Sequence, residues 1–223
     1  MVPSRVATTE DDEVRSSSDR QEAQTVSITT TSPDRLADTR VPISDVIAAR
    51  WSPRSFDATA EIDETALLSA LEAARWAASA SNTQPWRFIV GRRGSETYRL
   101  ISENLLGFNA AWASTAAALV VNIAEAETAD GTPLRWAEYD LGQAAATFAL
   151  QAHKNGLVTH PMGGFDVDGI RRAFGLDQRF VPVTVTAVGV IGSPEALESE
   201  VLRSRETAPR VRKSFEEVVL IDN

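Results

Sequence analysis

Residues 79–88, Ser-Ala-Ser-Asn-Thr-Gln-Pro-Trp-Arg-Phe, interrupt an alanine-rich helical pattern and lead directly into an apolar strand pattern. Their small hydroxyl and amide side chains let the backbone approach a ligand closely and offer hydrogen bonds at a helix-to-strand turn. Taken alone, the stretch also fits an ordinary polar loop. The segments on either side of it decide between the two interpretations.

Apolar periodicity predicts the elements around this loop. A helix capped by Asp63 leads into it, and strands are expected at 88–90, 116–123 and 182–192. Further helices are expected at 43–50, 95–102, 136–155 and 166–174. The helix at 136–155 is small or apolar on nearly every face, which places it at the centre of the subunit or between two subunits.

The composition predicts one folded domain behind a polar tail. With 223 residues, of which 43% are hydrophobic and 24% charged, the chain can bury one sizeable core. Residues 1–40 are rich in Ser, Thr, Asp, Glu and Arg and have almost no large apolar side chain, so we expect a disordered tail. The domain is expected at 41–223. An interaction tail is the alternative interpretation of residues 1–40.

Charge and residue usage exclude several classes of function. A formal net charge of -9 argues against a nucleic-acid partner, because phosphate backbones require a basic face. With no cysteine and only His153 and His160, we expect no metal site, and His153 is expected to be a satisfied structural residue. No apolar run is long enough to span a membrane and no signal core is present, so the expected location is the cytoplasm.

Two separated basic segments point to an anion. Arg50, Ser52 and Arg54 alternate, as they would if an extended segment turned them to one side, and Arg210 and Arg212 alternate near the C-terminus. Guanidinium groups bind phosphate through paired donors, so a convergence of these segments would make a phosphate site in an acidic protein. A pair of surface arginines is the alternative.

Two further segments complete the pattern. Residues 160–166, His-Pro-Met-Gly-Gly-Phe-Asp, form a rigid, glycine-bearing stretch whose backbone could lie flat against a planar ligand. The glycines do not form a dinucleotide-binding fingerprint, and no phosphate-binding lysine loop is present. Residues 218–221 are apolar and are expected to form a last strand or an apolar arm.

In this order, the segments resemble the FMN-dependent nitroreductase family over about Ile43 to Val219. Residues 50–56 are similar to its R-x-S-x-[RK]-x-F opening, 79–86 to its S-x-x-N-x-Q-P-W loop, and 161–166 to its P-x-x-G-F-D segment. Arg210-Val211-Arg212 resembles the closing basic pair, and Asn109 with Trp112 more loosely resembles an N-x-x-W stretch.

The resemblance implies an α+β fold with a mixed, mainly antiparallel sheet flanked by helices, in a domain-swapped homodimer with two FMN sites at the subunit interface. It implies three groups of cofactor-binding residues. The phosphate and ribityl chain would be held by Arg50, Ser52, Arg210 and Arg212, with Arg54 on the pyrimidine side of the ring. Pro161, Met162, Gly163, Gly164 and Asn109 would lie against the ring or its edge. Ser79, Asn82 and Gln84 would form the loop that reaches the flavin from the partner subunit.

The implied activity is an oxidoreductase that passes electrons from NAD(P)H to a nitroaromatic, quinone or related small acceptor by a ping-pong mechanism, without a catalytic side chain. Ala78 and Ala80 replace a proline and a serine of many relatives, and Gly163 and Trp112 replace a glutamate and a lysine of some. These changes remove polar contacts. A flavin-binding or sequestering protein with little turnover is therefore the alternative function.

Overall fold

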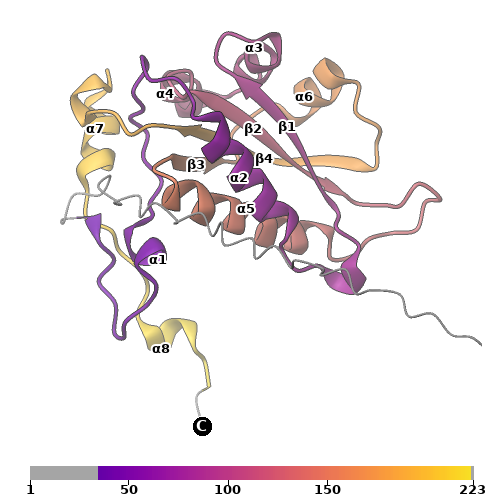
Figure 1. The fold of residues 1–223 in the computed structure, drawn as a ribbon, viewed down its shortest axis with the longest axis horizontal. Coiled ribbons are helices and arrows are strands. Elements are labelled where there is room, and N and C mark those ends of the chain that lie inside the picture. The colour runs from indigo at the N-terminus through magenta and orange to yellow at the C-terminus, as the bar shows by residue number, and fades with distance from the viewer. Residues whose placement is uncertain (1–34, 222–223) are drawn as a thin grey trace, which may run out of the picture.

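The computed structural model describes residues 35–221, with four strands and eight α-helices in that range (Figure 1). The strands are β1 Trp86–Arg92, β2 Ala118–Glu125, β3 Val158–Met162 and β4 Phe180–Gly189. The helices are α1 Asp45–Ala49, α2 Glu64–Arg75, α3 Glu96–Glu103, α4 Ala110–Ala113, α5 Ala137–Lys154, α6 Val167–Phe174, α7 Glu200–Thr207 and α8 Phe215–Val218. Short 3-10 helices are η2 Ala80–Asn82, η3 Gly107–Asn109 and η4 Pro194–Ala196.

The strands form one sheet in the order β1-β2-β4-β3, and each neighbouring pair is antiparallel. In the register, Val121 of β2 lies between Ile89 of β1 and Val185 of β4. Every residue of β2 is buried, as expected for a central strand covered on both faces. The predicted α+β class with a mainly antiparallel sheet is confirmed.

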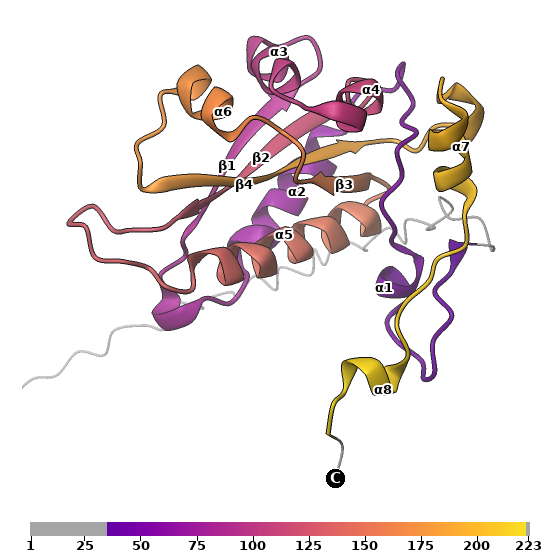
Figure 2. The same ribbon diagram turned by 180° about the vertical axis from the view of Figure 1, so that it is seen from behind.

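Helices cover both faces of the sheet (Figures 1 and 2). On one face, α2 and α5 pack on the strands through a cluster that includes Leu67 and Phe148 with Val120. On the other, α3 and α6 pack through Ile101 and Ile170 around Val121. Adjacent residues of β2 thus serve opposite cores, because successive side chains of a strand point to opposite faces.

Capping side chains lie at helix starts that the sequence predicts. Asp63 and Asp166 accept hydrogen bonds from the third helical N–H of α2 and α6, and Ser95 does the same for α3. Gly175 ends α6 in the left-handed region, with φ 59°. Each predicted helix exists within a few residues of its expected bounds.

The segment that begins the described chain, through α1, runs beside the segment that follows α7, away from the sheet (Figure 1). The Arg210 guanidinium donates to the main-chain carbonyls of Arg35 and Ala48, both at 2.6 Å. Arg35 also lies over the Trp51 ring, 3.9 Å from its centroid. The folded domain therefore begins before residue 41, and the rest of the expected tail, residues 1–34, lies outside the described residues.

Residues 218–221, expected to form either a last strand or an apolar arm, do not form a strand. Val218 ends the short helix α8, which a capping box at Ser214 begins, so no last strand forms at 218–221 in this chain. Val218, Leu220 and Ile221 are exposed, as the alternative of an apolar arm predicts. The capping box favours helix locally, and no neighbouring strand competes with it.

No helix among residues 35–221 is long and apolar enough to cross a membrane. In the same range, no group of three or more histidine, aspartate or glutamate side chains is arranged to hold a metal ion.

Candidate functional site

Three arginines converge where α1 ends. The helix stops at Arg50, and the extended segment after α7 brings Arg210 and Arg212 beside it. Burial, followed by the charges of Arg210 and Arg212, lowers the pKa of Arg50 below its ordinary value. The pKa of Arg210 is lowered in the same way, by burial and then by Arg212 and Arg35. The structure thus unites two basic segments about 160 residues apart in sequence.

Within residues 35–221 the side-chain hydrogen bonds of these arginines go to neutral oxygens, and Arg210 donates to the carbonyls of Arg35 and Ala48, both at 2.6 Å. Arg50 donates to Ser52 Oγ at 3.3 Å, and Arg212 donates to the carbonyl of its neighbour Val211 at 2.8 Å. Within residues 35–221 no carboxylate forms an ion pair with Arg50, Arg210 or Arg212. The electrostatic repulsion among them favours binding of an anion.

Arg54 lies on a segment that a buried carboxylate holds in place. Glu206 of α7 accepts hydrogen bonds from the main-chain N–H groups of Arg54, at 2.8 Å, and Ser55, at 3.1 Å. Burial raises the pKa of Glu206, and these two hydrogen bonds oppose that rise. No sequence motif singled out Glu206, because its partners are backbone groups about 150 residues away.

A two-glycine platform, residues 161–164, consists of the last two residues of β3 and the two glycines after it. Gly163 and Gly164 are exposed, and a Cβ added to Gly163 would meet nothing within 4 Å. The Asn109 side-chain amide donates to the Gly164 carbonyl at 3.1 Å, so Asn109 and the platform do meet. Met162 is only 3% exposed and its side chain belongs to the core, so only its main chain is available to a ligand. Pro161 is exposed and lies on the opposite face of β3 from Met162.

Both histidines are held in neutral form. His160 Nδ1 donates to the Pro53 carbonyl at 2.9 Å, and its ring lies 4.6 Å from that of Trp112. Burial, opposed by that hydrogen bond, lowers the pKa of His160 to about 4. His153 is 2% exposed, and burial lowers its pKa, followed by Arg50 and Arg210. Its burial fits the expected structural role, but its Nε2 has no hydrogen-bond partner among residues 35–221, so the expectation that the ring is satisfied is wrong.

The remaining predicted site residues lie on the loop between α2 and β1. Ser79 Oγ accepts the Gln84 N–H at 3.1 Å, and the Gln84 side chain donates to the Asn82 carbonyl at 3.1 Å. Ser81, Asn82 and Gln84 have φ values of 51°, 55° and 49°, and they are the only non-glycine residues with positive φ in the described chain. Such conformations cost on the order of 1–3 kcal/mol each and concentrate at functional sites.

The loop and the arginines occupy opposite ends of α5. Ala80 bonds to Asp140 in the first turn of α5, whereas His153, next to Arg50 and Arg210, lies in its last turn. His153 lies thirteen positions after Asp140, which at the rise of an α-helix is roughly 20 Å. One chain therefore does not bring Ser79, Asn82 and Gln84 to the arginine cluster.

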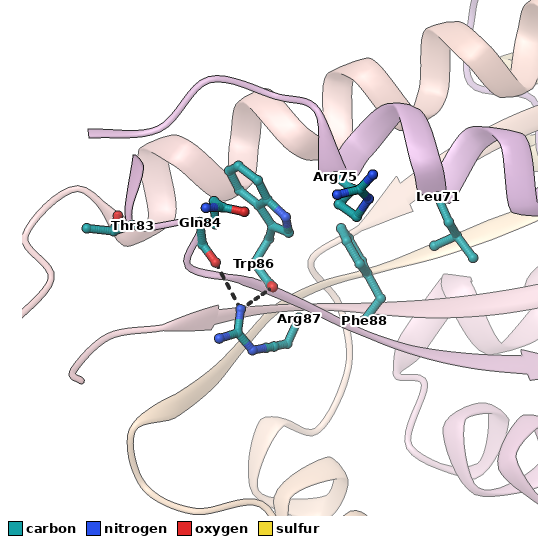
Figure 3. Close-up of a pocket in the computed structure, with 7 residues that line it drawn as sticks. All are labelled: Leu71, Arg75, Thr83, Gln84, Trp86, Arg87 and Phe88. Atoms are coloured by element: carbon teal, nitrogen blue, oxygen red, sulfur yellow. Dashed lines mark hydrogen bonds between the residues drawn. The ribbon is translucent and has the colours of Figure 1, made fainter. Parts of the chain in front are cut away.

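A surface hollow of about 510 Å³ lies beside the loop, between α2 and the free edge of β1 (Figure 3). Its lining includes Gln84 and two arginines that already have partners. Arg75 pairs with Glu72 at 2.5 Å, and Arg87 donates to the Gln84 and Trp86 carbonyls at 2.9 and 2.7 Å. The hollow is thus separate from the unpaired arginines.

Comparison with known proteins gives consistent matches. The model described as "Nitroreductase family" matches residues 47–120 and 103–190. A crystal structure described as an oxidoreductase containing FMN is 33% identical, with TM-score 0.76, over 81% of this chain and 92% of that one. An uncharacterised 15.4 kDa protein of Mycolicibacterium smegmatis is 36% identical over 59% of this chain and 92% of its own length. A Bacillus subtilis (strain 168) protein provisionally named NAD(P)H nitroreductase YdgI is 25% identical over 65% of this chain and 86% of its own.

Proposed function

The chain belongs to the nitroreductase family, and from that premise we propose that it is an FMN-dependent oxidoreductase that passes electrons from NAD(P)H to a nitroaromatic, quinone or related acceptor. The observation that carries the proposal is the convergence of Arg50, Arg210 and Arg212, without carboxylate partners among residues 35–221. Arg50 is also close enough to lower the pKa of His160, the residue before the open glycine platform.

A terminal phosphate fits the arginine cluster. Two of the three guanidiniums are partly buried and repel one another, and a phosphate dianion would remove that repulsion while accepting paired hydrogen bonds. Ser52, already bonded to Arg50, supplies a hydroxyl at the edge of the cluster for the ribityl chain.

A planar ring fits the platform. The main chain of Pro161, Met162, Gly163 and Gly164 offers a flat surface, and the open space at Gly163 leaves room for close approach. Arg54 would place a positive charge at the pyrimidine side of the ring, and Asn109 would lie at its edge. When bound, FMN supplies a centre that accepts hydride from NAD(P)H and returns two electrons to the acceptor. The protein's residues would bind, orient and shield the flavin, and no side chain needs to act as a nucleophile.

Two subunits would complete each site. Ser79, Asn82 and Gln84 lie at the opposite end of α5 from the arginine cluster of their own chain, roughly 20 Å along the helix. In a homodimer they would therefore contribute to the partner's flavin. Their internally bonded loop leaves the Ser79 hydroxyl proton and the Asn82 side chain available to a ligand.

Two relatives support the choice of FMN as cofactor and NAD(P)H as electron donor, although what their names say applies to those proteins. FMN belongs to the description of the crystal structure with 33% identity, and NAD(P)H belongs to the name of the B. subtilis protein. Ping-pong exchange is the kinetic form we propose, since the nicotinamide and the acceptor would use the same open face above Gly163.

The decisive experiment begins with the purified protein, which should be yellow and release FMN rather than FAD on heating. Anaerobic addition of NADH or NADPH should bleach the flavin, and menadione or nitrofurazone should restore its colour. Steady-state oxidation should give parallel double-reciprocal lines. Flavin that binds but is not bleached would support the sequestering alternative, and a colourless protein that cannot be loaded with FMN would reject both.

A further inference from the structure

An aromatic and basic rim lies beside the glycine platform, and the assigned site residues do not include it. The rim consists of Leu106, Phe108 and Arg205. Leu106 is 53% exposed and Phe108 is 61% exposed, so both apolar side chains are largely open to solvent. The Leu106 N–H donates to the Gly164 carbonyl at 3.1 Å, which fixes this part of the rim directly against the platform.

Arg205 reaches the rim from α7. Its guanidinium lies 5.6 Å from the centroid of the Phe108 ring. Two residues earlier on the same helix, Arg203 pairs with Glu200 at 2.9 Å, whereas within residues 35–221 Arg205 forms no ion pair and no side-chain hydrogen bond. The adjacent Glu206 cannot neutralise it by direct pairing, because both Glu206 oxygens accept from the backbone of residues 54 and 55.

We propose that Arg205 makes this site selective for aromatic acceptors that carry an anionic substituent, such as a carboxylate. The inference rests on the proposed function and names the acceptor class. The aromatic ring of the acceptor would lie between the flavin and Phe108, and its carboxylate would meet the Arg205 guanidinium.

The charges of the molecule favour this selection. A net charge of -9 repels small anions from most of the surface, so a local positive patch has a large effect on where an anion binds. A single FMN phosphate matches Arg50, Arg210 and Arg212, which leaves Arg205 for another ligand. Burial lowers the pKa of Arg54, Glu206 opposes this, and Arg205 lowers it further, so Arg205 is close enough to add its field to that of Arg54.

A matched pair of acceptors tests the proposal. Para-nitrobenzoate and para-nitrobenzamide have almost the same shape, but only the first is charged. In the FMN-loaded protein, Arg205→Gln should lower kcat/KM for para-nitrobenzoate about threefold to tenfold, the range between an exposed ion pair and a charged hydrogen bond. The value for para-nitrobenzamide should not change. High salt should reduce the benzoate preference of the parent protein and have little effect on the variant.

The control is Arg92→Gln. Arg92 pairs with Glu64 at 2.5 Å and lies outside the arginine cluster, the rim and the loop, so the variant removes one positive charge away from the site. This variant should discriminate between the two acceptors as the parent does. An equal loss in both variants would show a general effect of surface charge and would overturn the proposal.

A binding measurement separates failure of this inference from failure of the proposed function. Calorimetric titration of benzoate and benzamide into the loaded protein needs no turnover. Tighter binding of benzoate, lost in Arg205→Gln, supports the inference even if neither nitro compound is reduced. If the parent protein reduces menadione but binds benzoate no better than benzamide, the proposed function stands and the role of Arg205 is rejected.

Discussion

Arg212 is the exposed member of the arginine cluster, and its only hydrogen bond among residues 35–221 is to the adjacent carbonyl. Arg212→Ala should therefore weaken FMN binding and leave the fold intact. The loss of charge-assisted bonds to a phosphate should raise the dissociation constant roughly tenfold to a hundredfold. Titration of FMN into the apo variant, followed by flavin fluorescence, measures the change. Arg50→Ala should behave similarly.

Arg92→Ala is the matched control, since Arg92 pairs with Glu64 at 2.5 Å and lies outside the cluster. It should bind FMN as the parent does, and circular dichroism should report folded protein for all three variants. Parental affinity in both Arg50→Ala and Arg212→Ala would show that the phosphate lies elsewhere.

His160 predicts how stability changes with pH. Its pKa is about 4 in the folded chain and 6.5 in the reference state, so between these values only the unfolded chain binds the proton. The contribution of neutral His160 to the free energy of unfolding should be complete above pH 6.5. As the pH drops to 4, the free energy of unfolding should fall by up to roughly 3 kcal/mol.

Urea unfolding at several pH values compares the parent with His160→Asn, whose side-chain amide can still donate to Pro53. The variant should start less stable, because it loses the contact with Trp112, but its stability should fall less steeply between pH 6.5 and 4. Parallel pH profiles for the two proteins would contradict the buried neutral form of His160.

At the scale of the element, α5 holds the strained loop. Asp140 is 2% exposed and accepts the Ala80 N–H at 3.0 Å, and Gln143 donates to the Ala78 carbonyl at 3.3 Å. Asp140→Ala should loosen residues 78–85, because this hydrogen bond helps to offset the cost of three positive φ angles. Hydrogen exchange of a peptide covering the loop should accelerate about tenfold in the apo protein.

Glu138→Ala provides the comparison in the same turn of α5. Glu138 is exposed and makes no hydrogen bond to the loop in the described structure, so exchange of residues 78–85 should not change. If Asp140→Ala accelerates exchange throughout α2 and α5 as well, Asp140 supports the whole helix pair rather than the loop.

At the scale of the molecule, the exposed apolar surface predicts a homodimer. Trp76 and Tyr139 are exposed near the loop, and Val218, Leu220 and Ile221 are exposed on the arm. One chain leaves these groups in water, where they would favour association. Light scattering at micromolar concentration should give twice the 24.1 kDa of one chain. A mass of one chain would reject both the homodimer and a site shared between subunits.

Local sequence patterns predicted most of the helices and strands, and the order of the motifs predicted the family. Strand β3 and helix α7 were not predicted, because β3 is five residues long and contains Pro161, and α7 is mostly polar. Caps at Asp63, Ser95 and Asp166 and the stop at Gly175 act within one turn of backbone, so local chemistry sets these ends. The apolar run at 116–123 predicted a buried strand, which is β2, and the structure shows that this strand lies inside the sheet. The basic pairs around Arg50 and Arg210 could be recognised because their spacing is local, even though their meeting is not.

Which of these residues contact one another depends on the tertiary structure alone. The sequence could not show that Glu206 holds the backbone at Arg54, or that Asp140 holds Ala80, because those contacts join residues far apart in the chain. It also did not show that Met162 turns into the core, which depends on the pairing of β3 with β4. Helix α5 then sets a distance of roughly 20 Å between the loop of Ser79 and the arginines. Local propensity carries no information about such distances, because only the packing of distant segments determines them.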